Sequence, residues 1–132
     1  MKTTVDCSKG IKIGYNSVVN SRCRLDNRGS ISIGNNISIS SDVFILTADH
    51  DMNTSDFAGR TRGVIIDDYV WVGTRAIIML DITIGIGAVV AAGSLVTKNV
   101  MPYQIVPGVP CKFIKERVKD LKYDPTYKCL FQ

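Results

Sequence analysis

Residues 66–101 read IDDYVW VGTRAI IMLDIT IGIGAV VAAGSL VTKNVM when they are divided into blocks of six. Each block begins with an aliphatic residue, and its fifth position holds an aliphatic or small residue. An α-helix repeats its apolar positions every three to four residues, and a simple strand repeats them every two. A six-residue period fits neither, but it is typical of a parallel β-solenoid in which each block forms one short strand and one corner.

The same period is present in the earlier part of the chain. The first positions of these earlier blocks are Cys7, Ile13, Val19, Leu25, Ile33, Ile39 and Ile45. A two-residue slip interrupts them at 26–29, where the sequence Asp-Asn-Arg-Gly favours a turn and can hold a bulge at a corner. We expect the first and fifth side chains of every block to point inward. The period does not set the number of sides, but hexads of this kind are known to fold three blocks to a coil, and thirteen blocks then predict a little over four coils.

One long segment departs from the repeat. Between Ile45 and Ile66 the chain uses 21 residues where six would be enough, and residues 49–63 are polar and aperiodic. We expect an inserted surface loop at a corner, because solenoids accept insertions there and loops on rigid scaffolds often carry function.

The pattern changes again after Met101. Three prolines at 102, 107 and 110 end the strand signal, and apolar residues at 114, 118 and 121 predict a short amphipathic helix. The prediction is a single domain over 1–132, with a β-helix at 5–101 and a proline-rich loop, short helix and tail at 102–132.

Composition limits the classes of function. The net charge of +4 favours an anionic ligand but is too small to indicate nucleic-acid binding. The longest charge-free stretch, 82–97, is too short to span a bilayer, so we expect a cytoplasmic protein without a membrane span. The four cysteines lack metal-ligand spacing and are interpreted as reduced thiols, with a disulfide or metal role as the alternative.

His50 is the first candidate for chemistry. It is the only histidine of the chain, lies at the start of the insertion and is flanked by Asp49 and Asp51. Histidine titrates near neutral pH and can remove a proton from a hydroxyl group. The alternative is an exposed loop histidine without a role. A metal site is less favoured, because a metal would need symmetry mates or carboxylates alone.

A second candidate is a strip of small residues at 73–74 and 91–94. Thr74 and Ala92 are 18 residues apart, so they should stack on one side of the solenoid and leave room for an extended ligand. The alternative is that tight corners simply need small residues. Cations that follow this strip in sequence and suit phosphate groups are Lys98, Lys112 and Lys115.

Several motifs together resemble the hexapeptide-repeat O-acetyltransferases. They are IDDYVWVG at 66–73, VAAGSLVTKNV at 90–100 and PGVPCK at 107–112. The resemblance is to the maltose and galactoside acetyltransferases and to related enzymes that acetylate cell-envelope and capsular polysaccharides. The upstream segments VNSRCRLDNRG at 19–29 and IGNNISIS at 33–40 are most similar to the polysaccharide branch.

The resemblance implies an all-β, left-handed parallel β-helix and a homotrimer with each active site between two subunits. It implies acetyl-CoA as donor, no resident metal, and direct attack by a hydroxyl of a sugar or polysaccharide precursor. His50 falls at the position of the catalytic base and Asn20 at an acceptor-binding position. Positions that line the coenzyme A channel in the family are occupied by Thr74, Ala92, Thr97 and Lys98. Lys112 and Lys115 fall where relatives carry arginines near the 3′-phosphate.

Two other classes remain open at this point. A non-catalytic solenoid could serve as a binding or assembly module. A metal-dependent hydratase of the γ-carbonic anhydrase type would need three histidines around a metal at the subunit interface, and the chain supplies one.

Overall fold

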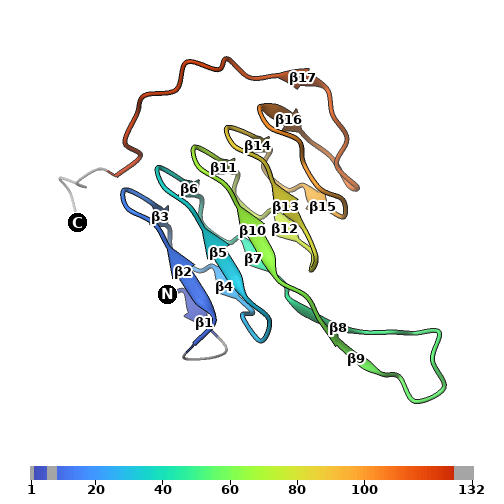
Figure 1. Ribbon diagram of the computed structural model, residues 1–132. Coiled ribbons are helices and arrows are strands. Elements are labelled where there is room, and N and C mark those ends of the chain that lie inside the picture. Colours follow the sequence, from blue (N-terminus) through green and yellow to red (C-terminus); the bar gives the residue numbers. More distant parts are fainter. Residues whose placement is uncertain (1, 6–8, 127–132) are drawn as a thin grey trace.

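The chain winds into a three-sided parallel β-solenoid (Figure 1). The computed structural model describes residues 2–5 and 9–126. Each side of the prism is a sheet of very short strands. The first four coils contribute one strand to each side in turn, and the fifth contributes a strand to two sides and a single bridge, between Ile84 and Val100, to the third. Sheets A and C each contain five parallel strands, so the solenoid has about five turns where the repeat count predicts a little over four.

The strands follow the hexads closely. Sheet A consists of β1 (Thr4–Val5), β4 (Arg24–Leu25), β7 (Phe44–Ile45), β12 (Ile77–Ile78) and β15 (Leu95–Val96). Sheet B consists of β2 (Ile11–Ile13), β5 (Ile31–Ile33), β10 (Val64–Ile66) and β13 (Thr83–Ile84). Sheet C consists of β3 (Val18–Val19), β6 (Ser38–Ile39), β11 (Trp71–Val72), β14 (Val89–Val90), β16 (Gln104–Val106) and β17 (Lys115–Glu116).

The core consists of columns of aliphatic side chains that run along the solenoid axis. On sheet A the register places Leu25 beside Ile45, Ile45 beside Ile78 and Ile78 beside Val96. All four side chains are buried, as are most first and fifth positions of the hexads. Full burial of such a side chain contributes about 1.5–3 kcal/mol. No coil can bury this surface alone, so the stacking of coils creates the core and the inward alternation predicted from the sequence is confirmed.

Two corners are formed by columns of residues with positive φ. The corner between sheets B and C has them at Asn16, Asn36, Tyr69, Gly87 and Tyr103. The corner between sheets C and A has them at Arg22, Asp42, Arg75, Gly93 and Gly108. At Gly87 an added Cβ would lie 2.4 Å from the Tyr103 ring, so that position requires glycine for space as well as for φ.

Both irregularities of the repeat fall at the remaining corner, between sheets A and B. Leu25 pairs with Ile45 while Ile78 pairs with Val96, so the early coil is two residues longer than the late one. The extra residues lie between β4 and β5, where the 26–29 slip predicts them. The insertion leaves the solenoid between β7 and β10, one coil further on at the same corner. There β8 (Ala48–His50) and β9 (Gly59–Thr61) form a hairpin that projects away from the prism (Figure 1).

The prediction of a short C-terminal helix is wrong. Among the described residues there is no helix, and the solenoid continues past Met101 because β16 joins sheet C beside β14. Lys115 and Glu116 then pair antiparallel with β16. The backbone groups along β16 give this segment hydrogen-bond partners that compete with a helix, and an isolated helix this short is marginal in water.

The segment after β17 runs back along the solenoid as an extended strap (Figure 1). Arg117 anchors it on the turns between sheets B and C. Its guanidinium donates to the carbonyl of Tyr69 at 2.9 Å and to the hydroxyl of Tyr123 at 2.8 Å. The Tyr69 and Tyr123 rings meet edge to face, with centroids 5.6 Å apart. The helical spacing of the apolar residues at 114 and 118 therefore does not define a buried face, because Ile114 and Val118 are exposed.

Candidate active site

The insertion is an ordered antiparallel hairpin. Its register pairs Ala48 with Thr61, Asp49 with Arg60 and His50 with Gly59. Both carboxylate oxygens of Asp49 accept hydrogen bonds from Arg60, each at 2.8 Å. These bonds hold the pKa of Asp49 below its usual range, and they tie the two strands together beside His50.

The His50 ring is oriented by Phe57 from the tip of the hairpin. Its Nδ1 lies 2.9 Å from the Phe57 carbonyl oxygen, and the two rings stack with centroids 4.2 Å apart. A carbonyl only accepts, so Nδ1 carries the proton of the neutral ring and Nε2 is left as the acceptor. The side chain is exposed, so the arrangement presents a basic nitrogen to an incoming molecule.

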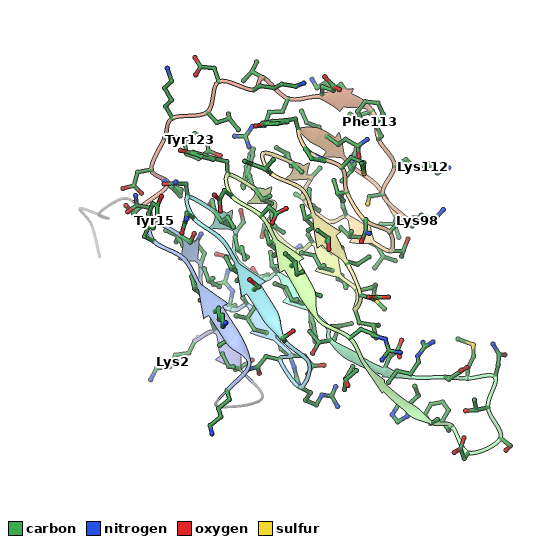
Figure 2. All side chains as sticks on the ribbon, viewed as in Figure 1. Lys2, Tyr15, Lys98, Lys112, Phe113 and Tyr123 are labelled. Carbon is green, nitrogen blue, oxygen red and sulfur yellow. The ribbon has the colours of Figure 1, made fainter. Side chains whose placement is uncertain are left out.

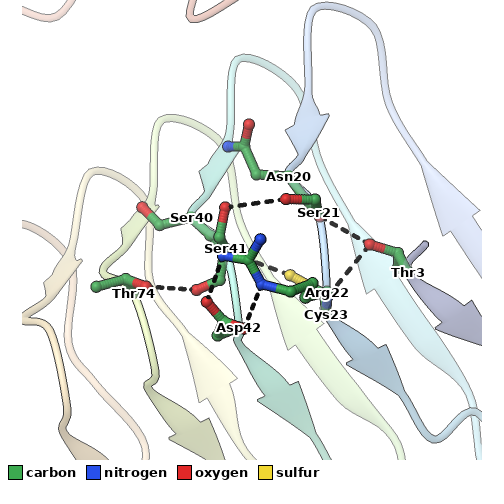
Figure 3. Close-up of polar contacts among 9 residues, drawn as sticks. All are labelled: Thr3, Asn20, Ser21, Arg22, Cys23, Ser40, Ser41, Asp42 and Thr74. Carbon is green, nitrogen blue, oxygen red and sulfur yellow. Dashed lines mark hydrogen bonds and ion pairs between the residues drawn. The ribbon is translucent and has the colours of Figure 1, made fainter. Parts of the chain in front are cut away.

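A second group of predicted site residues lies along the corner between sheets C and A (Figure 3). Asn20 follows β3, and its amide nitrogen donates to the carbonyl of Ile39 on the next coil at 2.9 Å. The Thr74 hydroxyl donates to the carbonyl of Ser41 at 2.6 Å. The amide of Gly93 donates to the carbonyl of Thr74 at 2.8 Å, so Thr74 and Ala92 occupy the same corner of adjacent coils, as their spacing predicts.

A cavity of about 310 Å³ lies against this corner. Its walls are mostly apolar and include Trp71, Gly73, Thr74, Val89 and Ala92. Gly73 is required by the close approach of the coils, because an added Cβ would lie 2.5 Å from the backbone nitrogen of Ala92. The strip of small residues thus serves the tight corner and also borders an open cavity, and its role in binding a ligand stays a prediction.

Trp71 is not among the site residues predicted from the sequence. It stands on the outer face of β11, about half exposed, and its indole nitrogen donates to the hydroxyl of Ser40 at 3.2 Å. It lines the 310 Å³ cavity on one side and a smaller cavity beside Arg117 and Tyr123 on the other. The available signal was a large aromatic residue at an outward position of the hexad, two residues before Gly73.

Thr97 and Lys98 lie at a different corner from Thr74 and Ala92. They follow β15, between sheets A and B, and Thr97 lines a cavity of about 430 Å³. The hairpin contributes Arg60 and Arg62 to the same cavity, and the coil above the hairpin contributes Met79, Leu80 and Asp81.

Lys112 and Lys115 lie at the C-terminal end of the solenoid. The backbone nitrogen of Lys112 donates to the carbonyl of Pro107 at 3.0 Å, and Lys115 in β17 pairs with Ile105. Both side chains are exposed. Figure 2 shows Lys98 and Lys112 near each other at the C-terminal end of the solenoid.

The predicted site residues are therefore divided within one chain. Asn20, Thr74 and Ala92 lie on the corner between sheets C and A, whereas His50 and Thr97 lie on the corner between sheets A and B. Sheet A separates the two corners. A single chain does not bring the predicted base and the predicted acceptor residue together.

The cysteines show no reactive arrangement in the part of the chain that the structure describes. Cys23 is a buried free thiol whose Sγ lies 3.1 Å from the Ser40 carbonyl, and burial raises its pKa. Cys111 is a free, half-buried thiol, and Cys7 and Cys129 lie outside the described residues. Within residues 2–5 and 9–126 there is no cluster of three or more His, Cys, Asp or Glu side chains suited to a metal ion. None of the described segments forms a helix able to cross a membrane.

The fold defines the class as a parallel β-helix of hexapeptide repeats. No protein-family model matches the chain. Among curated proteins, the galactoside O-acetyltransferase of Escherichia coli is 31% identical over 112 residues, which cover 80% of this chain and 54% of that protein. A chloramphenicol acetyltransferase of Morganella morganii is 49% identical over 61 residues, which cover 46% of this chain and 29% of that protein. The chain spans about half the length of the curated relatives it matches.

Solved structures give the same result. A maltose O-acetyltransferase from Clostridium difficile superposes with a TM-score of 0.85 at 33% identity, covering 89% of this chain and 65% of that one. A hexapeptide-repeat acetyltransferase of Vibrio cholerae, complexed with acetyl-CoA, superposes with a TM-score of 0.82 at 27% identity, covering 86% and 64%. Hexapeptide-repeat acetyltransferases of the galactoside and maltose type therefore match this chain in sequence and in structure, and the predicted left-handed β-helix is confirmed.

Proposed function

We propose that this protein transfers an acetyl group from acetyl-CoA to a hydroxyl of a sugar or polysaccharide precursor, with His50 as the general base. The observation that carries the proposal is the His50 ring, whose Nδ1 is held by the Phe57 carbonyl so that Nε2 is the free acceptor. In the reaction Nε2 takes the proton of the acceptor hydroxyl while the hydroxyl oxygen attacks the thioester carbonyl. The C–S bond then breaks, and the departing thiolate receives the proton from His50.

The donor is proposed to lie along the corner between sheets C and A. The cavity beside Thr74 and Ala92 has an apolar wall from Trp71 and Val89, which suits an extended pantetheine chain. Lys112 and Lys115 are the proposed partners of the phosphate groups at the C-terminal end of the solenoid. Lys98, on the corner between sheets A and B, is proposed to reach the phosphates of a donor bound on the neighbouring subunit. A lysine supplies charge without the bidentate geometry of arginine, so these contacts are expected to tolerate movement of the phosphates.

Asn20 is the proposed acceptor ligand. Its amide nitrogen is bonded to the Ile39 carbonyl, which leaves the side-chain oxygen as an acceptor for a substrate hydroxyl. The side-chain amide has a second N–H, so Asn20 is also able to donate to a developing oxyanion.

A thiol-release assay with acetyl-CoA tests the function. Monosaccharides, oligosaccharides and nucleotide sugars form the principal arm, and chloramphenicol forms a second arm because of the Morganella relative. We expect acceptor-dependent thiol release in the sugar arm and an acetylated product by mass spectrometry. Thiol release with chloramphenicol and with none of the sugars would mean that the acceptor is not a sugar. A protein that binds no acetyl-CoA would support the non-catalytic module instead.

We further propose a homotrimer in which each active site combines the His50 corner of one subunit with the Asn20 corner of its neighbour. The support is the division of these residues between two corners of one chain, together with a hairpin that projects beyond the prism. Such an interface repeats three times in a closed ring, so each site draws residues from two copies. The cytoplasm, where acetyl-CoA is available, is the proposed location.

Mixed oligomers of two inactive variants should recover activity. His50→Ala removes the base, and Ala92→Trp fills the 310 Å³ cavity on the opposite corner. Random assembly from equal amounts gives about a quarter of the sites both intact corners, so we expect about a quarter of wild-type turnover.

Each variant refolded alone is the matched control, and sedimentation at several concentrations gives the oligomeric state. A site contained within one chain predicts no recovery on mixing, and that result would overturn the shared site. A monomer at assay concentration would do the same.

A further inference from the structure

The two irregularities of the repeat form one structural unit. The 26–29 bulge and the root of the hairpin lie on consecutive coils at the corner between sheets A and B. We call residues 26–30 the socket. The amide of Val64 donates to the carbonyl of Ser30 at 2.9 Å, so the returning strand of the insertion rests directly on the socket.

Thr47 joins the socket to the hairpin. It is fully buried, at 0% exposure, and it is the residue before β8. Its hydroxyl donates to the carbonyl of Asp26 and accepts from the amide of Gly29 at 2.8 Å. Its own carbonyl accepts from the amide of Arg62, on the opposite side of the hairpin root, at 2.9 Å. One residue therefore bonds the bulge below it and closes the hairpin beside it.

Two glycines show how closely these parts fit. A Cβ added at Gly29 would lie 3.0 Å from the Thr47 Cβ and 3.1 Å from the Arg62 carbonyl oxygen. A Cβ added at Gly63 would lie 2.5 Å from the Ser30 hydroxyl. The Asp26 side chain is itself buried and accepts both hydrogen bonds of a bidentate pair from Arg28, at 2.8 and 2.7 Å, which stiffens the socket.

His50 lies on the hairpin, so the direction of the hairpin sets the position of the imidazole. His50 is three residues beyond Thr47, which corresponds to about 10 Å of extended strand. A tilt at the root is therefore magnified at the imidazole, and a displacement of about 1 Å can lower a rate about 100-fold. We propose that Thr47, bonded to the socket, is a positioning residue that fixes the direction of the hairpin and the place of His50. This inference rests on the proposed role of His50 as general base.

Thr47→Val tests the proposal, because valine keeps the shape and removes both hydroxyl interactions. We expect kcat to fall at least tenfold while KM for acetyl-CoA changes less than twofold, since the donor corner is untouched. Thr47→Ser keeps the hydroxyl and should restore kcat to within threefold of wild type. Gly29→Ala, which pushes the socket and Thr47 apart, should lower kcat in the same way.

Ser17→Ala is the matched control. Ser17 bridges the carbonyl of Gly34 and the amide of Ile37, at 2.7 and 3.1 Å, but it lies at the corner between sheets B and C. Ser17→Ala loses the same two kinds of hydrogen bond as Thr47→Val, so we expect its thermal midpoint to fall by a similar amount. We expect its kcat to stay within twofold of wild type. Equal kcat losses in both variants would mean that general stability, not hairpin direction, controls the rate, and would overturn the proposal.

A second readout does not depend on activity. Trypsin cleavage after Arg60 and Arg62, and amide exchange at Gly29 and Arg62, report the closure of the hairpin root. Both should accelerate at least fivefold in Thr47→Val and not in Ser17→Ala. Unchanged rates would refute the positioning role even in an active enzyme. If cleavage and exchange are faster in Thr47→Val but the wild-type protein has no transferase activity, the contact between Thr47 and the socket is supported and the proposed function is rejected.

Discussion

His50→Ala is expected to lower kcat by about 10²–10⁴-fold, the usual contribution of a positioned general base. The neutral ring has its proton on Nδ1, bonded to the Phe57 carbonyl, so Nε2 is the atom lost to the reaction. The side chain is exposed, so its removal leaves the buried columns of the solenoid unchanged. KM for acetyl-CoA should remain near the wild-type value, because the donor is proposed to bind along another corner.

Met52→Ala is the control for this measurement. Met52 lies in the same hairpin with an exposed fraction of 81%, so its truncation removes a surface side chain. We expect steady-state kcat within twofold of wild type and an unchanged thermal midpoint. His50→Ala with near-wild-type turnover in a folded oligomer would rule out the histidine mechanism.

Ile78→Ala is expected to have the largest effect on stability. Its side chain is 0% exposed and lies between Ile45 and Val96 in the column of sheet A. Truncation of a buried isoleucine removes its burial energy and leaves a cavity, at a cost of about 2–5 kcal/mol. Each coil contacts only its neighbours, so the defect weakens the stacking on both sides of it. Denaturant unfolding at a fixed protomer concentration measures the loss.

Ile77→Ala is the adjacent comparison. Ile77 points to the outer face of the same strand and is 39% exposed. We expect a loss below about 1 kcal/mol, because a half-exposed side chain gives up less buried area. Equal losses at positions 77 and 78 would contradict the inward and outward alternation of sheet A.

The scaffold was predictable because its signal is repeated. Each hexad places an aliphatic residue at the same inward position, and Ile66, Val72 and Ile78 are all buried as expected. The bulge at 26–29 was also predictable, since the phase of the repeat shifts there by two residues. Periodicity identifies these features because many coils report the same geometry.

The hairpin and the strap could not be derived in this way. The hairpin is stabilised by single pairs such as Asp49 with Arg60, which leave no periodic trace. In the strap, Ile114 and Val118 have helical spacing but remain exposed, and Arg117 instead finds the Tyr69 carbonyl 48 residues earlier in the chain. Such contacts depend on how coils are stacked, which local spacing does not encode.

The sequence predicts the corner of some candidate site residues but not which of the candidate residues lie together. The spacing of Thr74 and Ala92 places them on one corner, as the structure has them. Asn20 and His50 fall on different corners, because each hexad turns the chain onto a new face. Trp71 could not be assigned from the sequence, since an outward aromatic residue looks the same whether it borders a cavity or solvent.

The antiparallel direction of β17 has a consequence for the length of the particle. In a parallel sheet each new strand finds evenly spaced, slanted backbone groups on the strand before it. β17 occupies those groups on β16 and runs the opposite way, so a further copy meets a reversed strand of two residues in place of the parallel β16. The reversed strand thus opposes end-to-end fibre growth, to which a regular stack of coils is otherwise prone.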